Sequence, residues 1–137
     1  MEKIALPTAG LVVVEDNKLL LGYSRNKEAW YLLGGKVDQG ENSLEALLRE
    51  ITEETNLRLS PDSLQFYCHI SAPAYGENTH IVMEQDCFFY KLEEEIQASS
   101  EIDEIRFFDF DTYQTEPIQV PGVVLLYQRL IADGYLQ

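Results

Sequence analysis

The stretch GKVDQGENSLEALLREITEETNL, residues 35–57, decides the fold because it leads from a glycine-containing loop into one strongly patterned helix. Its large apolar residues follow the i, i+3, i+4, i+7 spacing of a buried helix face. They are Leu44, Leu47, Leu48 and Ile51. Asn42 and Glu45 form a capping-box pattern at the start, and Asn56 can adopt the left-handed conformation that ends a helix. We therefore predict a helix over residues 43–55.

Three carboxylates lie on one flank of this predicted helix. Glu50, Glu53 and Glu54 are separated by three and four residues, so their side chains project from one face. Three like charges in one patch repel each other, and the usual physical reason to keep them together is a hard divalent cation that prefers oxygen ligands, above all Mg²⁺. The sequence therefore predicts a metal site beside the buried face. The competing interpretation is an ordinary solvated acidic face.

The spacing around these acids resembles a family signature. Gly35 is followed after five residues by Glu41, and after seven more by the run REITEETNL, residues 49–57. This arrangement is similar to the motif of the Nudix hydrolases, which reads Gly, five residues, Glu, seven residues, Arg-Glu, an apolar residue, any residue, Glu-Glu, any residue, Gly and an apolar residue. Asn56 replaces the last Gly, and Asn is the next best residue for a positive backbone φ. Leu33 stands where many members carry Pro.

The resemblance implies the composition of the metal site. The carbonyl oxygen of Gly35 and three carboxylates would bind Mg²⁺, with Mn²⁺ as a possible substitute. The three carboxylates are those of Glu50, Glu53 and Glu54. Arg49 and Glu41 would hold the loop and the helix in register. Bound Mg²⁺ can neutralise phosphate charge, activate a water molecule and position it in line, which are the requirements for cleaving a phosphoanhydride.

The resemblance leaves the general base open. In this family Glu50 or Glu54 of the helix, or an acid in a later loop, can take the proton of the attacking water. Glu101 and Glu104, in the run SSEIDE before a predicted strand, match that loop. The two residues fit the position equally well, and ordinary solvated loop acids are the competing interpretation for both.

Two further residues are predicted to bind substrate. Lys36 follows two glycines directly and can reach a substrate phosphate as a point charge. Pro73 and Tyr75 lie 16 and 18 residues beyond Leu57, close to the positions of a proline in ADP-ribose hydrolases and a tyrosine in dinucleoside polyphosphate hydrolases. Both markers are nearly met, so they do not select a substrate class. Tyr75 can also stack on a base, although aromatic residues near strands more often belong to the core.

Length and composition favour one small domain over residues 1–137. The formal net charge of −14, from 10 basic and 24 acidic residues, argues against a nucleic-acid partner, whose phosphates need clustered Lys and Arg. Neither a signal-peptide pattern nor a long apolar run is found, so we expect a cytoplasmic protein that does not bind a membrane. Cys68 and Cys87 lie in apolar segments and are predicted to be reduced core residues. For His69 and His80 a structural role is expected.

Apolar runs separated by turn residues predict the remaining elements. Strands are predicted at residues 9–14, 18–23, 30–33, 65–72, 80–92 and 105–110, and a second helix at residues 120–133. A mixed β-sheet with helices on both faces is the simplest packing of these elements. The order also resembles the Nudix α/β/α sandwich, so the α/β fold class is expected.

Two functions follow from these observations. The first is Mg²⁺-dependent hydrolysis of a phosphoanhydride bond in a nucleoside diphosphate linked to another group, with a small nucleotide derivative as substrate. The alternative is a Nudix-like module that senses a nucleotide without cleaving it. Such a module is expected to lose signature carboxylates, and none is lost here. Isomerase chemistry on an isoprenoid diphosphate, known on this fold, lacks a supporting loop cysteine. A homodimer is left open.

Overall fold

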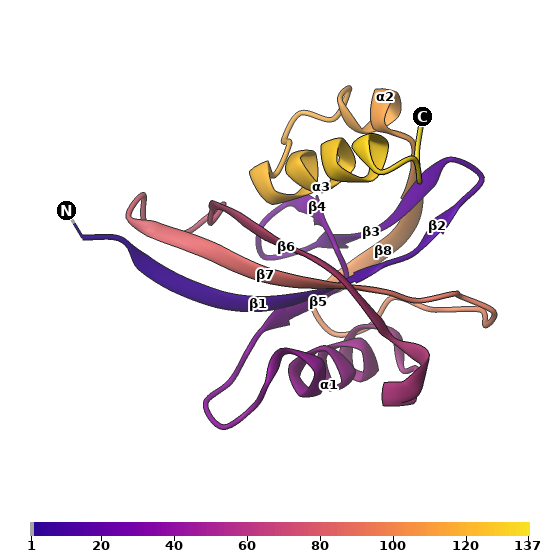
Figure 1. Ribbon diagram of the computed structural model, residues 1–137, viewed down its shortest axis with the longest axis horizontal. Helices are drawn as coiled ribbons and strands as arrows, with labels where there is room; N and C mark the ends of the chain where they lie inside the picture. Colours follow the sequence, from indigo (N-terminus) through magenta and orange to yellow (C-terminus); the bar gives the residue numbers. More distant parts are fainter. Residues whose placement is uncertain (1) are drawn as a thin grey trace.

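The computed structural model describes residues 2–137 and arranges them as strands flanked by helices (Figure 1). The strands are β1 (Ile4–Val12), β2 (Val14–Glu15), β3 (Lys18–Ser24), β4 (Ala29–Tyr31), β5 (Gly34–Lys36), β6 (Gln65–Pro73), β7 (Ile81–Phe89) and β8 (Ile102–Phe108). The helices are α1 (Ser43–Thr55), α2 (Phe110–Tyr113) and α3 (Pro121–Ala132), and a short 3-10 helix spans Pro61–Ser63.

The strands form two sheets. The first has the order β5-β1-β7-β6, and the second has the order β2-β3-β4 with β8 also paired to β3. The β1 and β7 strands pair in parallel from Ile4 and Ile81 to Val12 and Phe89, whereas the other pairs are antiparallel. Figure 1 shows α1 on one side of the strands and α2 and α3 on the other. The predicted α/β/α sandwich, with both parallel and antiparallel strand pairs, is therefore confirmed.

Helix α1 begins and ends where its capping residues predict. The Asn42 side chain accepts the backbone N–H of Glu45 at 2.8 Å, and the Glu45 side chain accepts the backbone N–H of Asn42 at 2.9 Å. At the other end Asn56 adopts the left-handed conformation, with φ of 61°. Asn tolerates this conformation better than other residues with a Cβ. The chain therefore makes the expected turn without the glycine of the signature.

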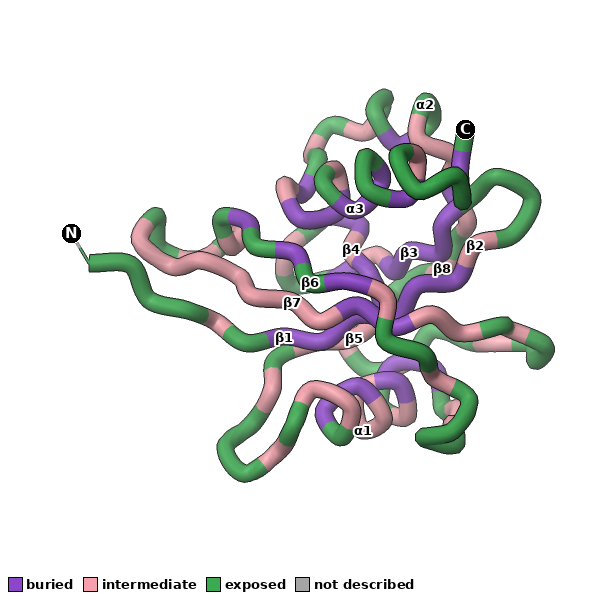
Figure 2. The backbone as a smooth tube through the Cα atoms, in the orientation of Figure 1, coloured by how far each residue is buried: buried purple, intermediate pink, exposed green. Residues whose placement is uncertain are grey.

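Figure 2 shows buried segments in the strands and in α1 and α3. The buried side chains form two clusters on opposite faces of β1. Neighbouring strand residues point to opposite faces, so Val12 enters one cluster while Leu11 and Val13 enter the other. The first cluster joins the two sheets to α3. The second joins the first sheet to α1 through Leu47 and Ile51. Helix α1 is therefore held against the sheet by its predicted apolar face.

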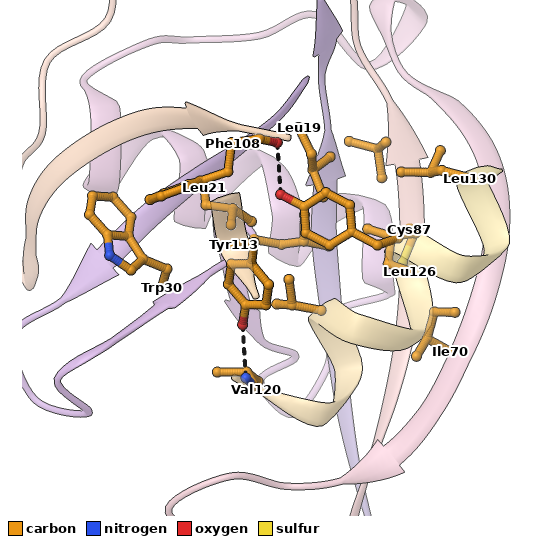
Figure 3. Close-up of a cluster of buried hydrophobic side chains, with 14 of the residues drawn as sticks. Leu19, Leu21, Trp30, Ile70, Cys87, Phe108, Tyr113, Val120, Leu126 and Leu130 are labelled. Carbon is orange, nitrogen blue, oxygen red and sulfur yellow. Dashed lines mark hydrogen bonds between the residues drawn. The ribbon is translucent and has the colours of Figure 1, made fainter. Parts of the chain in front are cut away.

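The larger cluster contains two fully buried tyrosines whose hydroxyl groups are hydrogen bonded (Figure 3). The Tyr127 hydroxyl donates to the carbonyl oxygen of Phe108 at 2.8 Å, and the Tyr113 hydroxyl accepts the backbone N–H of Val120 at 2.8 Å. A buried polar group without such a partner costs free energy. The two bonds therefore fix α2 and the start of α3 against the end of β8.

The predicted glycine loop is wrong, because Gly34 and Gly35 belong to a strand. The structure ends β4 at Tyr31 and pairs β5 with β1, Gly34 opposite Gly10 and Gly35 opposite Ala9. A Cβ at Gly34 would lie 2.0 Å from the carbonyl oxygen of Ala9, and the φ of Gly34 is +139°. Only glycine permits this conformation and this close approach. A short glycine strand gives no apolar alternation from which it could be predicted.

Three other strand boundaries differ from the prediction by three residues or more. Strand β1 begins at Ile4, five residues early, because its exposed first half pairs with β7. Strand β7 ends three residues early, at Phe89, and β8 begins three residues early, at Ile102. Helix α2 is absent from the prediction, since four residues are too few to show a helical repeat. Helix α3 agrees with its predicted bounds to within one residue at each end.

The cysteines behave as predicted. Cys68 on β6 and Cys87 on β7 are opposite each other in the strand register, and both are buried and free. Over residues 2–137, no helix combines the length and the apolar character needed to cross a bilayer.

Replacing Tyr127 by Phe should destabilise the fold. The change leaves the buried carbonyl oxygen of Phe108 without its 2.8 Å hydrogen bond, and an unpaired buried acceptor costs about 1 to 3 kcal/mol. The matched control is Tyr135→Phe, since Tyr135 is 52% exposed. The free energy of unfolding is measured by urea titration. Equal losses in both variants would contradict the importance of the buried bond.

His69 joins β6 to β7 through two carboxylates on the exposed side of the sheet. Its Nδ1 lies 2.8 Å from Asp86 and its Nε2 lies 2.7 Å from Glu84. The hydrogen bonds to Asp86 and then to Glu84 raise the pKa of His69 above its ordinary value. The protonated ring donates to both carboxylates, which agrees with the expected structural role.

The stabilisation by His69 should depend on pH. Because the folded-state pKa is raised, the contribution is fully present below the unfolded value of about 6.5 and is lost as the pH rises through the folded value. We therefore expect the difference in unfolding free energy between wild type and His69→Gln to shrink from pH 6 to pH 9. His80→Gln removes the other histidine and is the control. A difference that stays constant across this range would argue against the ion pairs.

Candidate active site

A cavity of about 440 Å³ is lined by residues of both sheets and of α1. Part of its wall is acidic and consists of Glu50, Glu54 and Glu101. Another part is apolar. The apolar part includes Leu6, Leu32, Met83 and Val120. The cavity thus combines a charged region with a region suited to an uncharged group.

The acidic region brings three carboxylates into one cluster. One oxygen atom from each of Glu50, Glu54 and Glu101 lies within 4.8 Å of the others. Glu50 and Glu54 are neighbours on α1, one helical turn apart. The loop before β8 supplies Glu101, and the backbone N–H of Ser99 in this loop donates to the carbonyl oxygen of Glu54 at 2.8 Å. This bond ties the loop to the end of α1.

Glu54 is the most buried of the three carboxylates, with 3% of its surface exposed. Burial raises its pKa to about 9, and the charges of Glu50 and Glu101 add to the shift. The backbone N–H of Gly34 donates to the Glu54 carboxylate at 2.8 Å and opposes it. Without a cation, Glu54 therefore holds its proton at neutral pH.

Glu50 lies directly over the glycine strand. A Cβ on Gly35 would lie 2.6 Å from the Glu50 carboxyl carbon, so a larger residue at this position would force the Glu50 carboxylate to move. Burial raises the pKa of Glu50, whereas the hydrogen bond from Arg49 lowers it. Arg49 Nη1 donates to Glu50 at 3.0 Å. The charged guanidinium therefore orients one carboxylate of the cluster.

Arg49 also makes the predicted contact with Glu41. Its Nε and Nη2 donate to the two Glu41 oxygens at 2.8 and 3.0 Å, a bidentate pair. The pair lowers the pKa of Glu41. Nη2 additionally donates to the carbonyl oxygen of Lys36 at 3.1 Å. Through these bonds Arg49 connects the helix to the loop and to β5.

Two predicted acids lie outside the cluster. The Glu53 carboxylate lies 3.5 Å from Arg49 Nη1 and is 48% exposed, and it is not among the three clustered carboxylates of the described residues. Its role as a ligand stays a prediction. Glu104 lies on β8 and accepts hydrogen bonds from Arg106. Of the two loop acids, the geometry brings only Glu101 to the cavity.

Lys36 and Tyr75, the predicted substrate-binding residues, both line the cavity. Lys36 Nζ lies 3.7 Å from Glu77, which also pairs with Lys27 at 2.9 Å. The backbone carbonyl of Tyr75 accepts the hydroxyl of Tyr31 at 3.4 Å. Whether either residue contacts substrate stays a prediction.

Four cavity residues carry no motif signal in the sequence. Lys27 and Glu77 come from separate connections between strands, and their pairing at 2.9 Å is a tertiary contact. Thr8 and Gln85 face the cavity from β1 and β7. From the sequence, such a residue can be recognised only as a polar residue at an inward-facing position of a predicted strand. Thr8 cannot be recognised in this way, because the predicted strand begins at residue 9.

The fold and the site agree with the class implied by the signature. A family model, the NUDIX domain, matches residues 5–127. The chain therefore belongs to the Nudix family. The crystal structure of the MutT protein from Methanosarcina mazei Go1 has the same fold, with a TM-score of 0.75, 19% identity and 97% of each chain covered.

Two curated relatives add sequence similarity. The mRNA-decapping enzyme subunit 2 of Saccharomyces cerevisiae is 30% identical over 115 residues, which cover 79% of this chain and 11% of that protein. The U8 snoRNA-decapping enzyme of Homalodisca vitripennis is 34% identical over 103 residues, which cover 74% of this chain and 50% of that protein. The chain thus spans about a tenth of the first relative's length and half of the second's.

Replacing Glu54 by Gln should stabilise the protein in EDTA at pH 8. The unfolded chain ionises Glu54 near its ordinary pKa of 4.5, whereas the folded chain keeps the proton up to about 9. Wild-type stability therefore falls as the pH rises between these values. Gln has no proton to lose, so we expect a gain of at least about 1 kcal/mol, the equivalent of roughly one pKa unit.

Thermal melts at pH 5 and pH 8 measure this effect. The gain should be smaller at pH 5, where the unfolded carboxyl is only partly ionised. Glu53→Gln, at an exposed position beside Arg49, is the matched control and should change stability by less than about 0.5 kcal/mol. A lower melting temperature for Glu54→Gln at pH 8 would show that the crowded carboxylate is not destabilising.

Proposed function

We propose that this chain hydrolyses a phosphoanhydride bond in a nucleoside diphosphate linked to another group, with Mg²⁺ as cofactor and Mn²⁺ as a possible substitute. The observation that carries the proposal is the cluster of Glu50, Glu54 and Glu101 in the wall of a cavity large enough for a nucleotide. Membership of the Nudix family supports it.

The donor atoms suit a hard divalent cation. All three clustered groups are carboxylates with one oxygen each within 4.8 Å of the others, and Mg²⁺ prefers oxygen ligands. Their mutual repulsion and the raised pKa of Glu54 are the costs that a cation would relieve. We propose Glu50, Glu54 and Glu101 as the holding groups, joined by the Gly35 carbonyl. Glu53 is retained as a predicted ligand at the rim.

The chain's own residues would position the reacting groups. Arg49 fixes Glu50 at 3.0 Å, and the backbone N–H of Gly34 fixes Glu54 at 2.8 Å. When bound, Mg²⁺ would neutralise phosphate charge and favour ionisation of the attacking water. We propose that the general base is one of the clustered carboxylates, since these surround the proposed cation site. Lys36 would bind a substrate phosphate as a point charge.

The substrate is proposed to be a small nucleotide derivative. The names of the two curated relatives describe decapping of RNA, but this chain has a net charge of −14, which disfavours an extended RNA contact. Tyr75, in the cavity wall beside Tyr31 with ring centroids 6.4 Å apart, would contact the substrate. The alternative is a module that senses a nucleotide without cleaving it. Loss of signature carboxylates would support it, and this sequence keeps all of them.

Hydrolysis of ADP-ribose, dinucleoside polyphosphates and nucleoside diphosphate sugars tests the proposal. Product formation should require Mg²⁺ or Mn²⁺ and should stop in EDTA. Glu54→Gln should lower kcat by about a hundredfold or more, the usual loss when a charge-stabilising contact is removed. Glu95→Gln, an exposed loop substitution, is the control with the same change in charge.

The outcomes separate the alternatives. Full activity in EDTA would overturn the metal-dependent proposal. Nucleotide binding without any product would favour the sensing module. Glu101→Gln and Glu104→Gln are compared under the same conditions, and a loss confined to Glu101→Gln is expected because only Glu101 joins the cluster.

A further inference from the structure

The cavity has a polar patch on its floor that the acidic cluster does not include. Thr8 on β1 and Gln85 on β7 are direct neighbours in the parallel pairing of these strands, and both line the cavity. Around them the wall is apolar, with Leu6 and Met83 from the same two strands. Two uncharged polar side chains thus interrupt an apolar surface.

The Thr8 hydroxyl is buried without a hydrogen bond. Thr8 is 8% exposed, and its Oγ1 has no hydrogen-bond partner among residues 2–137. An unpaired buried hydroxyl is destabilising, and valine fills the same shape without this cost. A threonine at this position is therefore explained best by a bond that forms when a ligand is present.

Gln85 offers its amide nitrogen in the same patch. The thiol of Cys87 lies 3.8 Å from the Gln85 side-chain oxygen and donates weakly to it, while no bond from the amide nitrogen is found within residues 2–137. The nitrogen lies against Gly10, where an added Cβ would be 3.0 Å away. The floor therefore presents the two amide N–H groups of Gln85 and the hydroxyl of Thr8, all able to donate.

We propose that Thr8 and Gln85 bind the hydrogen-bond acceptors on the edge of the substrate's nucleobase. The inference rests on the proposed function and names the part of the nucleotide that this floor selects. Neither Thr8 nor Gln85 carries a charge, and a phosphate would favour a charged partner such as Lys36, the neighbour of Thr8 on β5. A flat ring with carbonyl oxygens or ring nitrogens matches uncharged donors between apolar walls. Leu32 and Val120 supply further apolar contact.

The strand register connects this floor to the phosphate region. Thr8 pairs with Lys36 across β1 and β5 as well as with Gln85 across β1 and β7. Neighbouring strands are about 4.8 Å apart, so the floor lies about 10 Å or less from the strand that carries Lys36. This separation suits the base and the diphosphate of one nucleotide. The base would then lie over the first sheet while the diphosphate approaches the carboxylates.

The floor should discriminate between bases more strongly than a purely apolar pocket would. A site with buried donors rejects a ligand that leaves them unpaired, because the desolvation cost is then not recovered. Thr8 and Gln85 would thus determine specificity without taking part in the bond cleavage.

Binding of unphosphorylated nucleosides tests this inference apart from hydrolysis. Adenosine, guanosine, cytidine and uridine are titrated into the metal-free protein, and the side-chain amide of Gln85 is followed by NMR. At least one nucleoside should shift this signal. Its affinity should fall tenfold or more in Thr8→Val and in Gln85→Leu. Thr115→Val, at an exposed threonine outside the cavity, is the matched control and should bind like wild type.

Folding of the variants is checked by thermal melts. In the absence of ligand, Thr8→Val should melt at the same temperature as wild type or higher, because it removes an unpaired buried hydroxyl. Weaker binding in a variant of equal or greater stability would therefore report the lost contact. A lower melting temperature would show that the hydroxyl is already satisfied in the free protein and would overturn the argument.

Two binding results would also overturn the assignment. One is the absence of any nucleoside effect on Gln85, and the other is a larger effect of ribose 5-phosphate, which would assign the floor to the sugar phosphate. Hydrolysis by the same preparation is measured in parallel. Hydrolysis without nucleoside binding would refute the base site and leave the hydrolase, whereas nucleoside binding without hydrolysis would do the opposite.

Discussion

The buried carboxyl group of Glu54 is the constraint on which the site depends. Its side chain accepts the N–H of Gly34, and its backbone carbonyl accepts the N–H of Ser99. One residue thereby joins α1 to the glycine strand and to the loop that carries Glu101. The helix keeps this residue inside although burial disfavours its charge. The stability lost at this position is the cost of holding acidic groups close together.

The charged side chains are concentrated in particular parts of the cavity wall. The Arg49 guanidinium donates both to Glu41 in the supporting loop and to Glu50 in the acidic cluster. Lys27 and Lys36 share Glu77 on another part of the wall. The apolar part of the wall is formed by uncharged side chains that include Leu6, Leu32 and Met83. A ligand with an anionic middle and a neutral ring would therefore have one favourable orientation.

Local signals explain how much could be predicted from the sequence. Helix α1 was predictable to the residue because its caps and apolar face lie within the same short segment, and membership of the family followed from the same residues. The choice between Glu101 and Glu104 was not predictable, because it depends on the bond from Ser99 to a residue 45 positions away. The contact between Glu53 and Arg49, at 3.5 Å, is likewise a side-chain detail that helical spacing alone does not specify.

The parallel pairing of β1 with β7 has a consequence for folding. Ile4 is aligned with Ile81. During synthesis, β1 therefore cannot pair with β7 until more than half of the chain has been made. Long-range pairing of this kind forms slowly, since the intervening chain must first lose entropy in closing a large loop. The glycine strand and α1 can assemble locally, but the floor beneath them is complete only after β7 has docked. A nascent chain would therefore form the helix that carries Glu50 and Glu54 well before the cavity beside it is complete.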